Sequence, residues 1–450
     1  MARGARLSMW RPLYAVVTAL LAPLVWLRLH WRARREPLYA TAIGERFGRY
    51  RGPRTRGWTW VHAVSLGETR AAASLIAALR VADPSLRLLL THGTATGREA
   101  GAALLRDGDR QLWLPWDSAG ATRRFFAHHR PRVGVLMETE IWPNLLHAAR
   151  AAGVPMALAN ARLSARSLRR AARMPGLMRP ATGSFALVLA QTDADAARLR
   201  DAGAGSVEVC GNLKFDMTPE PALLAAGRAW RDAIGRRVVL ASSTRDGEEA
   251  ALLEAWRALP ESSRDSPPGA SPGAPTPPRP LLLIVPRHPQ RFDVVADLVR
   301  AAGFALARRS NWGDTPPPDA VAAEVWLGDS MGELPLYYAC AQIALLGGSF
   351  EPLGGQNLIE AAACGCPVLM GPHTFNFAQA SELAEAAGAA RRVATLPEAV
   401  AIACESLPAA EQRAAIQRCL DFAARHRGAA RQMAARIVAL LAVQPRARAR

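Results

Sequence analysis

The sequence predicts an α/β protein with two Rossmann-like domains, and three observations support this prediction. Short apolar runs alternate with alanine-rich helical stretches, which is typical of a parallel sheet covered by helices. The alternation restarts in the second half of the chain, and 450 residues exceed what one ordinary hydrophobic core needs. Ligands of such sheets bind outside the carboxyl ends of the strands, so we expect the domains to face each other across a cleft.

The expected strands are the apolar runs themselves. In the first half they cover residues 61–66, 87–93, 132–138, 154–160 and 185–191, and in the second half 236–243, 280–287, 324–329, 341–349 and 366–372. Helical patterns lie between them, for example at 68–82 and 143–153. The segment FDMTPEP brings two prolines near 215–230, which indicates a boundary between a domain at 36–222 and a domain at 223–435.

Residues 1–35 are predicted to form a membrane anchor with a basic flank. The stretch Pro12–Leu27 has no charge, tryptophans stand near its two ends, and arginines lie beyond them, as membrane interfaces select. The run is short for a straight span of roughly 20 residues, and Pro23 would kink a helix. Spanning the membrane and lying in its interface therefore both remain open. The basic cluster after the run favours the cytoplasmic side for the rest of the chain.

Two further segments are predicted to lie outside the packed domains. Residues 262–280 are rich in proline, glycine and serine, a composition typical of a disordered insertion. Residues 436–450 end in PRARAR and are interpreted as a basic tail.

The chain is strongly basic, with 56 Lys and Arg against 38 Asp and Glu and a formal net charge of +18. Such an excess is typical of a protein with a polyanionic partner: nucleic acid, an anionic membrane face or a phosphorylated substrate. A nucleic-acid binder would cluster basic and aromatic residues on one surface, whereas here the charge is spread along the helices, so no nucleic acid is expected. The arginines expected to face an anionic membrane are Arg46, Arg49, Arg51, Arg54 and Arg56. The six cysteines show no zinc or disulfide spacing, and no metal site is expected.

Three segments of the first half contain charged candidate residues: two follow predicted strands, and one lies near the domain boundary. In HAVSLGETRAA (62–72), Gly67 is expected to let the backbone turn closely, and Glu68 begins a helix, where a carboxylate is stabilised as an anion able to accept a proton. METEIWPNLL (137–146) places Glu138 and Glu140 at the carboxyl end of a strand. Helix capping is the simple alternative for these carboxylates. GNLKFD (211–216) places Lys214 near the domain boundary, where a lone lysine is usually just solvated.

The second half contains a composite pattern that indicates a nucleotide phosphate site. VPRHPQRF (285–292) follows a strand, GDSMGEL (328–334) opens a helix, and residues 347–377 span strand, loop and helix. The glycines at 347, 348, 354 and 355 are expected to leave backbone N–H groups free for phosphate. Arg287 and a helix N-terminus would complete the cradle without a metal, and Asn357 and Glu360 would share one helix face.

Together these segments resemble the Kdo transferases, which move 3-deoxy-D-manno-octulosonic acid (Kdo) from CMP-Kdo to the lipid A precursor in the Gram-negative inner membrane. The resemblance extends from the anchor to about residue 430. It rests on GERFG (44–48), SLGET, THGTATG (91–97), METEIWPN, NARLSARS (160–167), LKFD, VPRHPQRF, DSMGEL, GGSFEPLGGQN and MGPHTFNF. It implies the GT-B type of fold and an inverting transfer to the tetra-acylated precursor in lipopolysaccharide core synthesis. It also implies no cofactor or metal, and a location on the cytoplasmic face of the inner membrane, whose surface is anionic.

The resemblance also implies roles for individual residues. Glu68 matches the general base, and Glu138 and Lys214 match residues that stabilise the transition state. The CMP-binding positions would be Pro286, Arg287, Met331, Gly332, Glu333, Asn357, Leu358, Ile359 and Glu360. Two alternatives remain open: a GT-B enzyme that uses a UDP-sugar, and a basic, membrane-tethered protein that binds nucleic acid.

Overall fold

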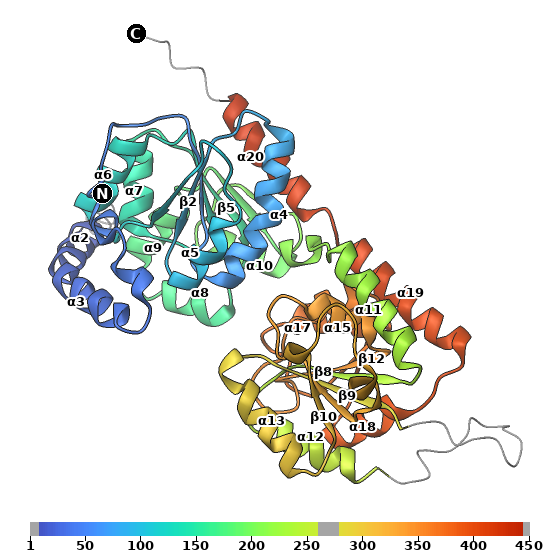
Figure 1. The fold of residues 1–450 in the computed structure, drawn as a ribbon. Coiled ribbons are helices and arrows are strands. Elements are labelled where there is room, and N and C mark those ends of the chain that lie inside the picture. The colour runs from blue at the N-terminus through green and yellow to red at the C-terminus, as the bar shows by residue number, and fades with distance from the viewer. Residues whose placement is uncertain (1–8, 260–278, 444–450) are drawn as a thin grey trace, which may run out of the picture. The chain divides into compact units, whose positions relative to one another are not determined.

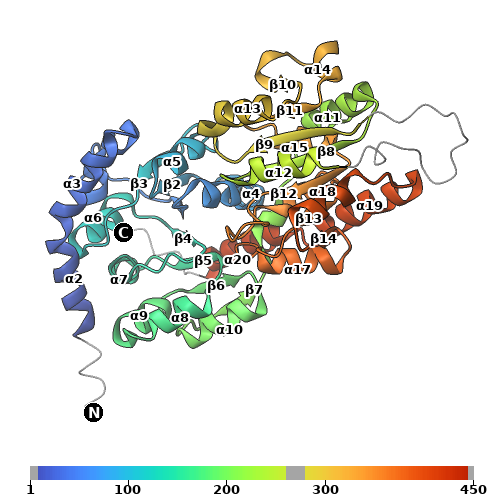
Figure 2. The same cartoon turned by 90° about the horizontal axis from the view of Figure 1, so that it is seen from below.

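The computed structural model describes residues 9–259 and 279–443, which form two compact units. Unit 1 contains the chain up to Asp216 together with the residues from His426 onward, and unit 2 contains Met217–Arg425. Each unit is built on a seven-stranded, wholly parallel sheet with helices on both faces (Figures 1 and 2). The two predicted α/β domains are therefore confirmed.

The sheet of unit 1 has the order β3-β2-β1-β4-β5-β6-β7. Its strands are β1 (Thr59–His62), β2 (Leu88–His92), β3 (Arg110–Trp113), β4 (Val133–Met137), β5 (Met156–Ala161), β6 (Leu187–Ala190) and β7 (Val207–Val209). Because β1 pairs with both β2 and β4, the order reverses between β1 and β4, which makes this the switch point where such sheets bind ligands.

The sheet of unit 2 has the order β10-β11-β9-β8-β12-β13-β14. Its strands are β8 (Val238–Thr244), β9 (Leu281–Pro286), β10 (Leu306–Arg308), β11 (Val325–Leu327), β12 (Ile343–Leu346), β13 (Val368–Met370) and β14 (Ala390–Arg392). Here β8 pairs with β9 and β12, so the switch point lies between β8 and β12.

The helices that cover these sheets follow the strand–helix alternation of the sequence. Unit 1 contains α4 (Leu66–Ala82), α5 (Ala95–Ala102), α6 (Ala119–His129), α7 (Pro143–Ala151), α8 (Ala165–Ala171), α9 (Pro175–Thr182), α10 (Asp193–Asp201) and α20 (Ala429–Val443). Unit 2 contains α11 (Pro221–Ile234), α12 (Glu248–Arg257), α13 (Phe292–Ala301), α14 (Pro318–Ala322), α15 (Leu334–Cys340), α16 (Leu358–Ala363), α17 (Ala378–Ala386), α18 (Leu396–Cys404) and α19 (Ala409–Arg425).

The hydrophobic core of unit 1 lies on both faces of its sheet. Neighbouring residues of β1 belong to different clusters: Trp60 packs with Phe125 on one face, and Val61 packs with Leu75 on the other. All four side chains are fully buried. This alternation follows from the two-residue period of a strand, and it explains why strands buried on both faces appear in the sequence as continuous apolar runs.

The division between the domains falls inside the predicted range of 215–230, but the predicted end of the second domain at 435 and the predicted tail need correction. Unit 1 ends at Asp216, six residues before the predicted boundary at 222, and α20 returns the chain to unit 1. Residues 436–443 are helical and not a tail, because Met433 and Ile437 of α20 are fully buried in the core against α4. The rest of the predicted tail, 444–450, and most of the predicted insertion 262–280 fall outside the described residues; only Arg279 and Pro280 of the insertion are described, just before β9.

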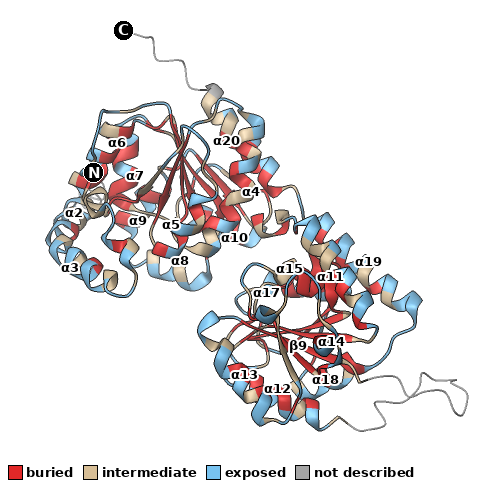
Figure 3. Cartoon of the chain, in the orientation of Figure 1, coloured by how far each residue is buried: buried red, intermediate tan, exposed pale blue. Residues whose placement is uncertain are grey.

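The N-terminal segment forms two helices, α2 (Trp10–Leu20) and α3 (Ala22–Ala33), with a break of 44° that Pro23 explains. Within the described chain, neither helix alone is long and apolar enough to cross a membrane, although the bent pair meets that test by length and composition. One face of α2 is bonded to unit 1: the Tyr14 hydroxyl donates to Asp117 at 2.9 Å, and the Trp116 indole donates to the Thr18 carbonyl at 2.8 Å. The other face is exposed (Figure 3).

Candidate active site

The predicted residues of unit 1 gather at its switch point. Glu68 lies in the first turn of the helix after β1, Glu138 follows β4 directly, and Lys214 lies in the 3-10 turn η3 (Leu213–Asp216). The charges of Glu68 and Glu138 both act on the pKa of Lys214, so the three groups lie within electrostatic reach of one another. The parallel sheet thus brings together residues that are far apart in the sequence.

Glu68 caps its own helix. Its carboxylate accepts hydrogen bonds from the Val64 N–H at 2.8 Å and the Ser65 hydroxyl at 3.2 Å, while the Ser65 oxygen accepts the Glu68 N–H at 3.4 Å. This arrangement is a capping box, so the alternative interpretation that Glu68 caps its helix is confirmed. A carboxylate offers about four lone-pair directions, and two are used here. Burial raises the pKa of Glu68 and Glu138 adds to the rise, which makes Glu68 a stronger base than an exposed glutamate.

Gly67 does not have the predicted backbone role. A side chain added there would meet nothing within 4 Å, and its φ is not in the left-handed region. It occupies the first turn of α4, where any residue fits the backbone. The prediction of a close backbone turn at Gly67 is therefore wrong.

Glu138 is buried, with 6% of its surface exposed, and it adopts a left-handed backbone with a φ of 56°. A non-glycine residue in this region costs about 1–3 kcal/mol and is held by its surroundings. The carboxylate pairs with the Arg162 guanidinium, Oε2 to Nε, at 2.9 Å. The switch point therefore holds an anion that is fixed in place by a cation from the segment after β5.

Lys214 is positioned by Asn160, which also has a left-handed backbone, with a φ of 52°. The Asn160 side-chain oxygen accepts the Leu213 N–H at 3.0 Å, and the Asn212 side chain accepts the Lys214 N–H at 3.0 Å. Burial lowers the pKa of Lys214, and the charge of Glu138 opposes that change. The Lys214 ammonium is thus held next to carboxylates and is partly shielded from solvent.

The structure adds two residues to which the sequence analysis assigned no role. One is Arg162, the partner of Glu138. The other is Glu140, whose pKa rises to about 7 because of burial and the nearby charge of Glu68, although the Trp142 indole donates to it at 2.6 Å. Both stand in segments that carry the family resemblance, METEIWPN and NARLSARS; for Arg162 this was the only signal, whereas Glu140 was also recognised at the carboxyl end of a strand.

The predicted CMP-binding residues of unit 2 follow three neighbouring strand ends. Pro286 ends β9 and Arg287 comes next, residues 331–333 follow β11, and residues 357–360 follow β12. In the sheet, β11 and β9 are adjacent, and only β8 separates β9 from β12. Because all strands are parallel, these segments lie at one edge of the sheet.

The glycine-rich loop after β12 does not offer the free N–H groups that were predicted. The N–H of Gly348 donates to both oxygens of the buried Glu248 carboxylate at 2.8 Å, the N–H of Gly347 donates to Ser242, and that of Gly355 donates to Gly348. Glycine is needed for packing: a side chain at Gly347 would lie 2.3 Å from the Ser243 carbonyl oxygen. The prediction of a phosphate-binding glycine loop is therefore wrong for these three positions.

The helix after this loop begins with a polar N-cap that is followed by two buried apolar residues. Asn357 is the N-cap of α16, and its side-chain oxygen accepts the Ile359 N–H at 3.2 Å. Leu358 and Ile359 are each 1% exposed as whole residues, so neither their side chains nor their backbone atoms offer an open surface. Glu360 lies in the first turn and is partly exposed.

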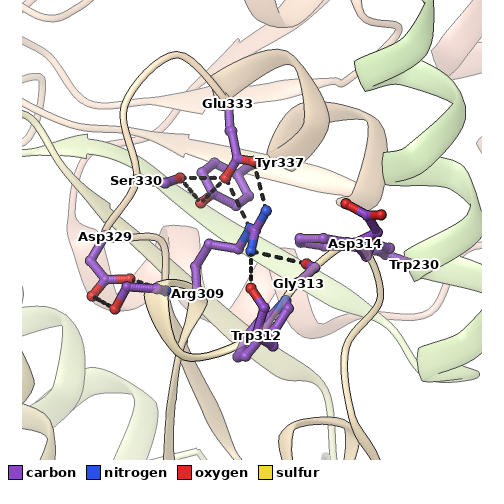
Figure 4. A network of polar contacts seen from close by, with 10 residues as sticks. Trp230, Arg309, Trp312, Gly313, Asp314, Asp329, Ser330, Glu333 and Tyr337 are labelled. Carbon is purple, nitrogen blue, oxygen red and sulfur yellow. Dashed lines mark hydrogen bonds and ion pairs between the residues drawn. The ribbon is translucent and has the colours of Figure 1, made fainter.

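The Glu333 side chain is held by a polar network that Figure 4 shows. Arg309 grips both carboxylate oxygens, with Nε and Nη2 at 2.9 and 2.8 Å, and the Ser330 hydroxyl donates to Oε2 at 2.5 Å. Arg309 also donates to the carbonyls of Trp312 and Gly313. Burial alone would raise the pKa of Glu333, but Ser330 and Arg309 together hold it below its ordinary value.

A second pair of charges joins the same two segments. Arg308 donates to Asp329 at 2.7 Å, and Asp329 also accepts the Ser310 N–H at 2.8 Å. Residues 308–310 thus fix the segment that carries Met331 and Gly332. Met331 is 65% exposed, and Gly332 has a φ of 87°. Glu333 therefore shapes this segment with its side chain, while Met331 and Gly332 stay exposed.

Positive charge collects at the carboxyl ends of β8 and β9. Arg245 follows β8 and Arg287 follows β9, and both lower the pKa of His288, after the larger effect of burial. Arg245 lies close to Gly348, because a side chain added at that glycine would approach its Cγ to 3.7 Å. Arg245 was not predicted. In the described part of the chain no group of three or more His, Cys, Asp or Glu side chains is arranged to hold a metal ion.

One of the five arginines assigned to the membrane surface has a different role. Arg46 donates to the Gly93 carbonyl at 2.9 Å and lies over the Trp113 ring at 4.1 Å, and burial lowers its pKa to about 10. It is a packing residue of unit 1, and its assignment to the membrane is wrong. The other four arginines, at 49, 51, 54 and 56, are exposed.

The two Rossmann-like units define the class of protein. The fold is similar to that of a glycosyltransferase from Rickettsia africae, with a TM-score of 0.56 at 11% identity, over 86% of this chain and 100% of that one. This is the fold of the two-domain glycosyltransferases of the GT-B type.

Sequence comparison identifies the family within that class. The model of the family described as 3-deoxy-D-manno-octulosonic-acid transferase (kdotransferase) matches residues 41–217. A 3-deoxy-D-manno-octulosonic acid transferase of Bordetella pertussis is 49% identical over 434 residues, which cover 94% of this chain and 98% of that protein. Its counterpart in Haemophilus influenzae is 34% identical over 82% of this chain and 84% of its own length. The chain therefore belongs to the Kdo transferase family and is a glycosyltransferase.

Proposed function

We propose that this Kdo transferase moves Kdo from CMP-Kdo to a tetra-acylated lipid A precursor, with inversion at the anomeric carbon and without a cofactor or metal. The observation that carries the proposal is the group of Glu68, Glu138 and Lys214 at the switch point of unit 1, where a base of raised pKa stands beside a paired anion and a half-buried cation. Membership of the Kdo transferase family indicates that the transferred sugar is Kdo.

The proposed reaction is a single displacement. A hydroxyl oxygen of the acceptor bonds to the anomeric carbon of Kdo, the bond from that carbon to the CMP phosphate oxygen breaks, and its electron pair leaves with CMP. The hydroxyl proton passes to Glu68. Attack from the face opposite the leaving group inverts the carbon. A positioned base contributes typically 10²- to 10⁴-fold to such a step, and Glu138 and Lys214 would stabilise the charge that develops at the reacting centre.

The nucleotide is assigned to unit 2. Arg287 and Arg245 provide positive charge for the CMP phosphate, which departs as a dianion. The exposed Met331 and Gly332 and the N-terminus of α16 at Asn357 provide the remaining contacts. Leu358 and Ile359 are buried as whole residues, and they would act by packing the N-terminus of α16 in place.

We further propose that α2 and α3 place the chain on the cytoplasmic face of the inner membrane by lying in its interface. The outer side of α2 exposes Leu13, Val16 and Leu20 at 57, 56 and 72%. Its inner side is bonded to unit 1 through Tyr14 and Thr18. A spanning α2 would have to give up these bonds, whereas an interfacial helix keeps them.

The test is a transferase assay on the full chain with CMP-Kdo and the tetra-acylated precursor, comparing Glu68→Gln with the native protein. Glutamine keeps an oxygen for the Val64 N–H, so the cap is retained while proton acceptance is removed. We expect turnover to fall by about 10²- to 10⁴-fold, with CMP-Kdo binding unchanged.

The matched control is Glu99→Gln, an exposed glutamate on α5, which should leave turnover unchanged. Near-normal turnover of Glu68→Gln would reject Glu68 as the base. Turnover with a UDP-sugar and none with CMP-Kdo would reject the proposed donor.

A further inference from the structure

A groove of about 760 Å³ runs between α6 and α7 on the surface of unit 1. Its floor includes Phe126 and Val154, and its rim includes Arg123 and Arg130 of the α6 side and His147 of α7. None of the proposed catalytic or CMP-binding residues lines it. The groove is therefore a feature that the proposed reaction does not use.

The groove gathers cations whose charge is not met inside unit 1. Within the described residues, the cations Arg11, Arg123 and Arg130 line the groove and form no ion pair or side-chain hydrogen bond. Arg132 also lines it, but its charge is met by Asp83. No acidic side chain is among the described lining residues. A site with positive charge and no internal anion is complementary to an anionic ligand.

The groove lies beside apolar surface. Arg11 sits in the first turn of α2 and forms part of the groove wall. The same helix exposes Leu13 at 57% and Val17 at 42%, so cationic and apolar side chains share one short helix. Burial lowers the pKa of His147, and the charges of Arg11 and Arg150 lower it further, so the positive charge of the groove comes from its arginines.

We infer that this groove binds the phosphate-bearing headgroup of an acidic glycerophospholipid while α2 takes up the acyl region. Unpaired arginines fit the phosphate, and the exposed side chains of α2 fit the chains attached to it, a combination that a soluble anion would not need. The inference rests on the proposed membrane placement of α2. It is independent of the proposed acceptor and donor.

The test uses the full chain and vesicles of phosphatidylcholine with or without phosphatidylglycerol. The variant is Arg123→Gln/Arg130→Asn, in which asparagine suits the left-handed backbone of residue 130, with its φ of 41°. Two surface arginines contribute roughly 10- to 30-fold to binding of an anionic surface. We expect the variant to lose that factor on phosphatidylglycerol vesicles and to match the native chain on phosphatidylcholine alone.

The control variant Arg413→Gln/Arg431→Gln removes the same charge from exposed positions outside the groove. It should bind both kinds of vesicle as the native chain does. An equal loss of binding in the control would show that the effect depends only on net charge, and it would overturn the inference. Native protein that binds neither kind of vesicle would instead reject the membrane placement of α2.

A second measurement distinguishes the sources of phosphate. Short-chain phosphatidylglycerol, as a soluble monomer, should shift the ring signals of His147 in the native chain and not in the variant. Equal shifts with inorganic phosphate would show a general anion site and overturn the lipid assignment. A raised KM for the lipid A precursor in detergent, with unchanged vesicle binding, would assign the groove to the acceptor and also overturn it.

Discussion

Units 1 and 2 are both built on a seven-stranded parallel sheet with one switch point, although the order of their strands is not the same, and they differ in the residues that come after their strands. In unit 1, the switch point between β1 and β4 carries Glu68 and Glu138, two side chains with charges that act on each other. In unit 2, the switch point between β8 and β12 carries Arg245 and a glycine-rich loop whose N–H groups are mostly bonded inside the unit. The sheet determines where a site lies, and the residues after the strands determine its chemistry.

The acidic groups of the two sites shift in opposite directions. At the unit 1 site, burial and crowding of carboxylates raise the pKa of Glu68 and Glu140. At the unit 2 site, burial alone would raise the pKa of Glu333 and Asp329, but hydrogen bonds and arginines outweigh it and lower both pKa values. A crowded site with raised pKa values suits proton transfer, whereas paired carboxylates suit the shaping of a binding surface.

The largest expected effect comes from separating the charges of the unit 1 site. Arg162→Met leaves Glu138 buried without its 2.9 Å partner, and we expect turnover to fall by about 10²-fold. CMP binding, which is assigned to unit 2, should not change, and Arg162→Lys should recover part of the loss. Steady-state kinetics measures turnover, and titration with CMP measures nucleotide binding. A Met variant with native turnover would contradict a positioning role for Arg162.

A smaller effect is expected from the network of unit 2. Arg309→Lys keeps the charge but loses the two-pronged grip on Glu333, which loosens the segment carrying Met331 and Gly332. We expect CMP to bind about 10-fold more weakly by calorimetry (roughly 1.4 kcal/mol). Arg257→Lys, on the far end of α12, is the matched control and should bind CMP normally. Weakened binding in both variants would contradict the assignment.

The dependence of stability on pH should have opposite signs for Glu140 and Glu333. The folded pKa of Glu140, about 7, lies above its ordinary value of 4.5, so its contribution is fully present below pH 4.5 and is lost as the pH rises through 7. The folded pKa of Glu333 lies below its ordinary value, so its contribution is present above pH 4.5 and is lost as the pH falls through the folded pKa.

Denaturant unfolding of Glu140→Gln and Glu333→Gln at several pH values tests this contrast. At pH 8 we expect Glu140→Gln to be more stable than the native chain by about 1–2 kcal/mol. Glu333→Gln should be less stable at neutral pH and should lose this difference in acid. Parallel curves for the two variants would contradict the opposite shifts.

The smallest expected effect is a change in stability of opposite sign when alanine replaces two glycines in similar segments, Gly67 in SLGE and Gly332 in SMGE. Gly67→Ala meets open space in a helical turn and should stabilise unit 1 by about 0.5–1 kcal/mol. Gly332→Ala also meets open space, but its φ of 87° makes alanine strained, so a loss of about 1 kcal/mol or more is expected. Thermal unfolding measures both, and a stabilised Gly332→Ala would show that the segment moves freely.

The sequence predicted the ten inner strands and missed the four outer ones. The strands that were not predicted are β3, β7, β10 and β14, which form the two edges of each sheet. An edge strand is short and partly exposed, so it has no continuous apolar run, as the exposed residues of β7 illustrate. Inner strands buried on both faces do have such a run.

The candidate site was predictable only in part, for a related reason. Glu68 and Glu138 could be found because they directly follow apolar runs. Arg162 could not, since its importance comes from an ion pair that forms only when β4 and β5 lie side by side. The phosphate role of the glycine loop was wrong because sequence does not show which N–H groups a buried carboxylate such as Glu248 will bond.

The return of α20 to unit 1 has a consequence for how the protein is made. Asp216 accepts the N–H groups of Gly428 and Ala430 at 2.5 Å, and α20 then covers α4. The unit whose residues leave the ribosome first is consequently closed last, after all of unit 2 has been synthesised. Until then its apolar face is open to chaperones, and a chain truncated before α20 contains a complete unit 2 and an incomplete unit 1.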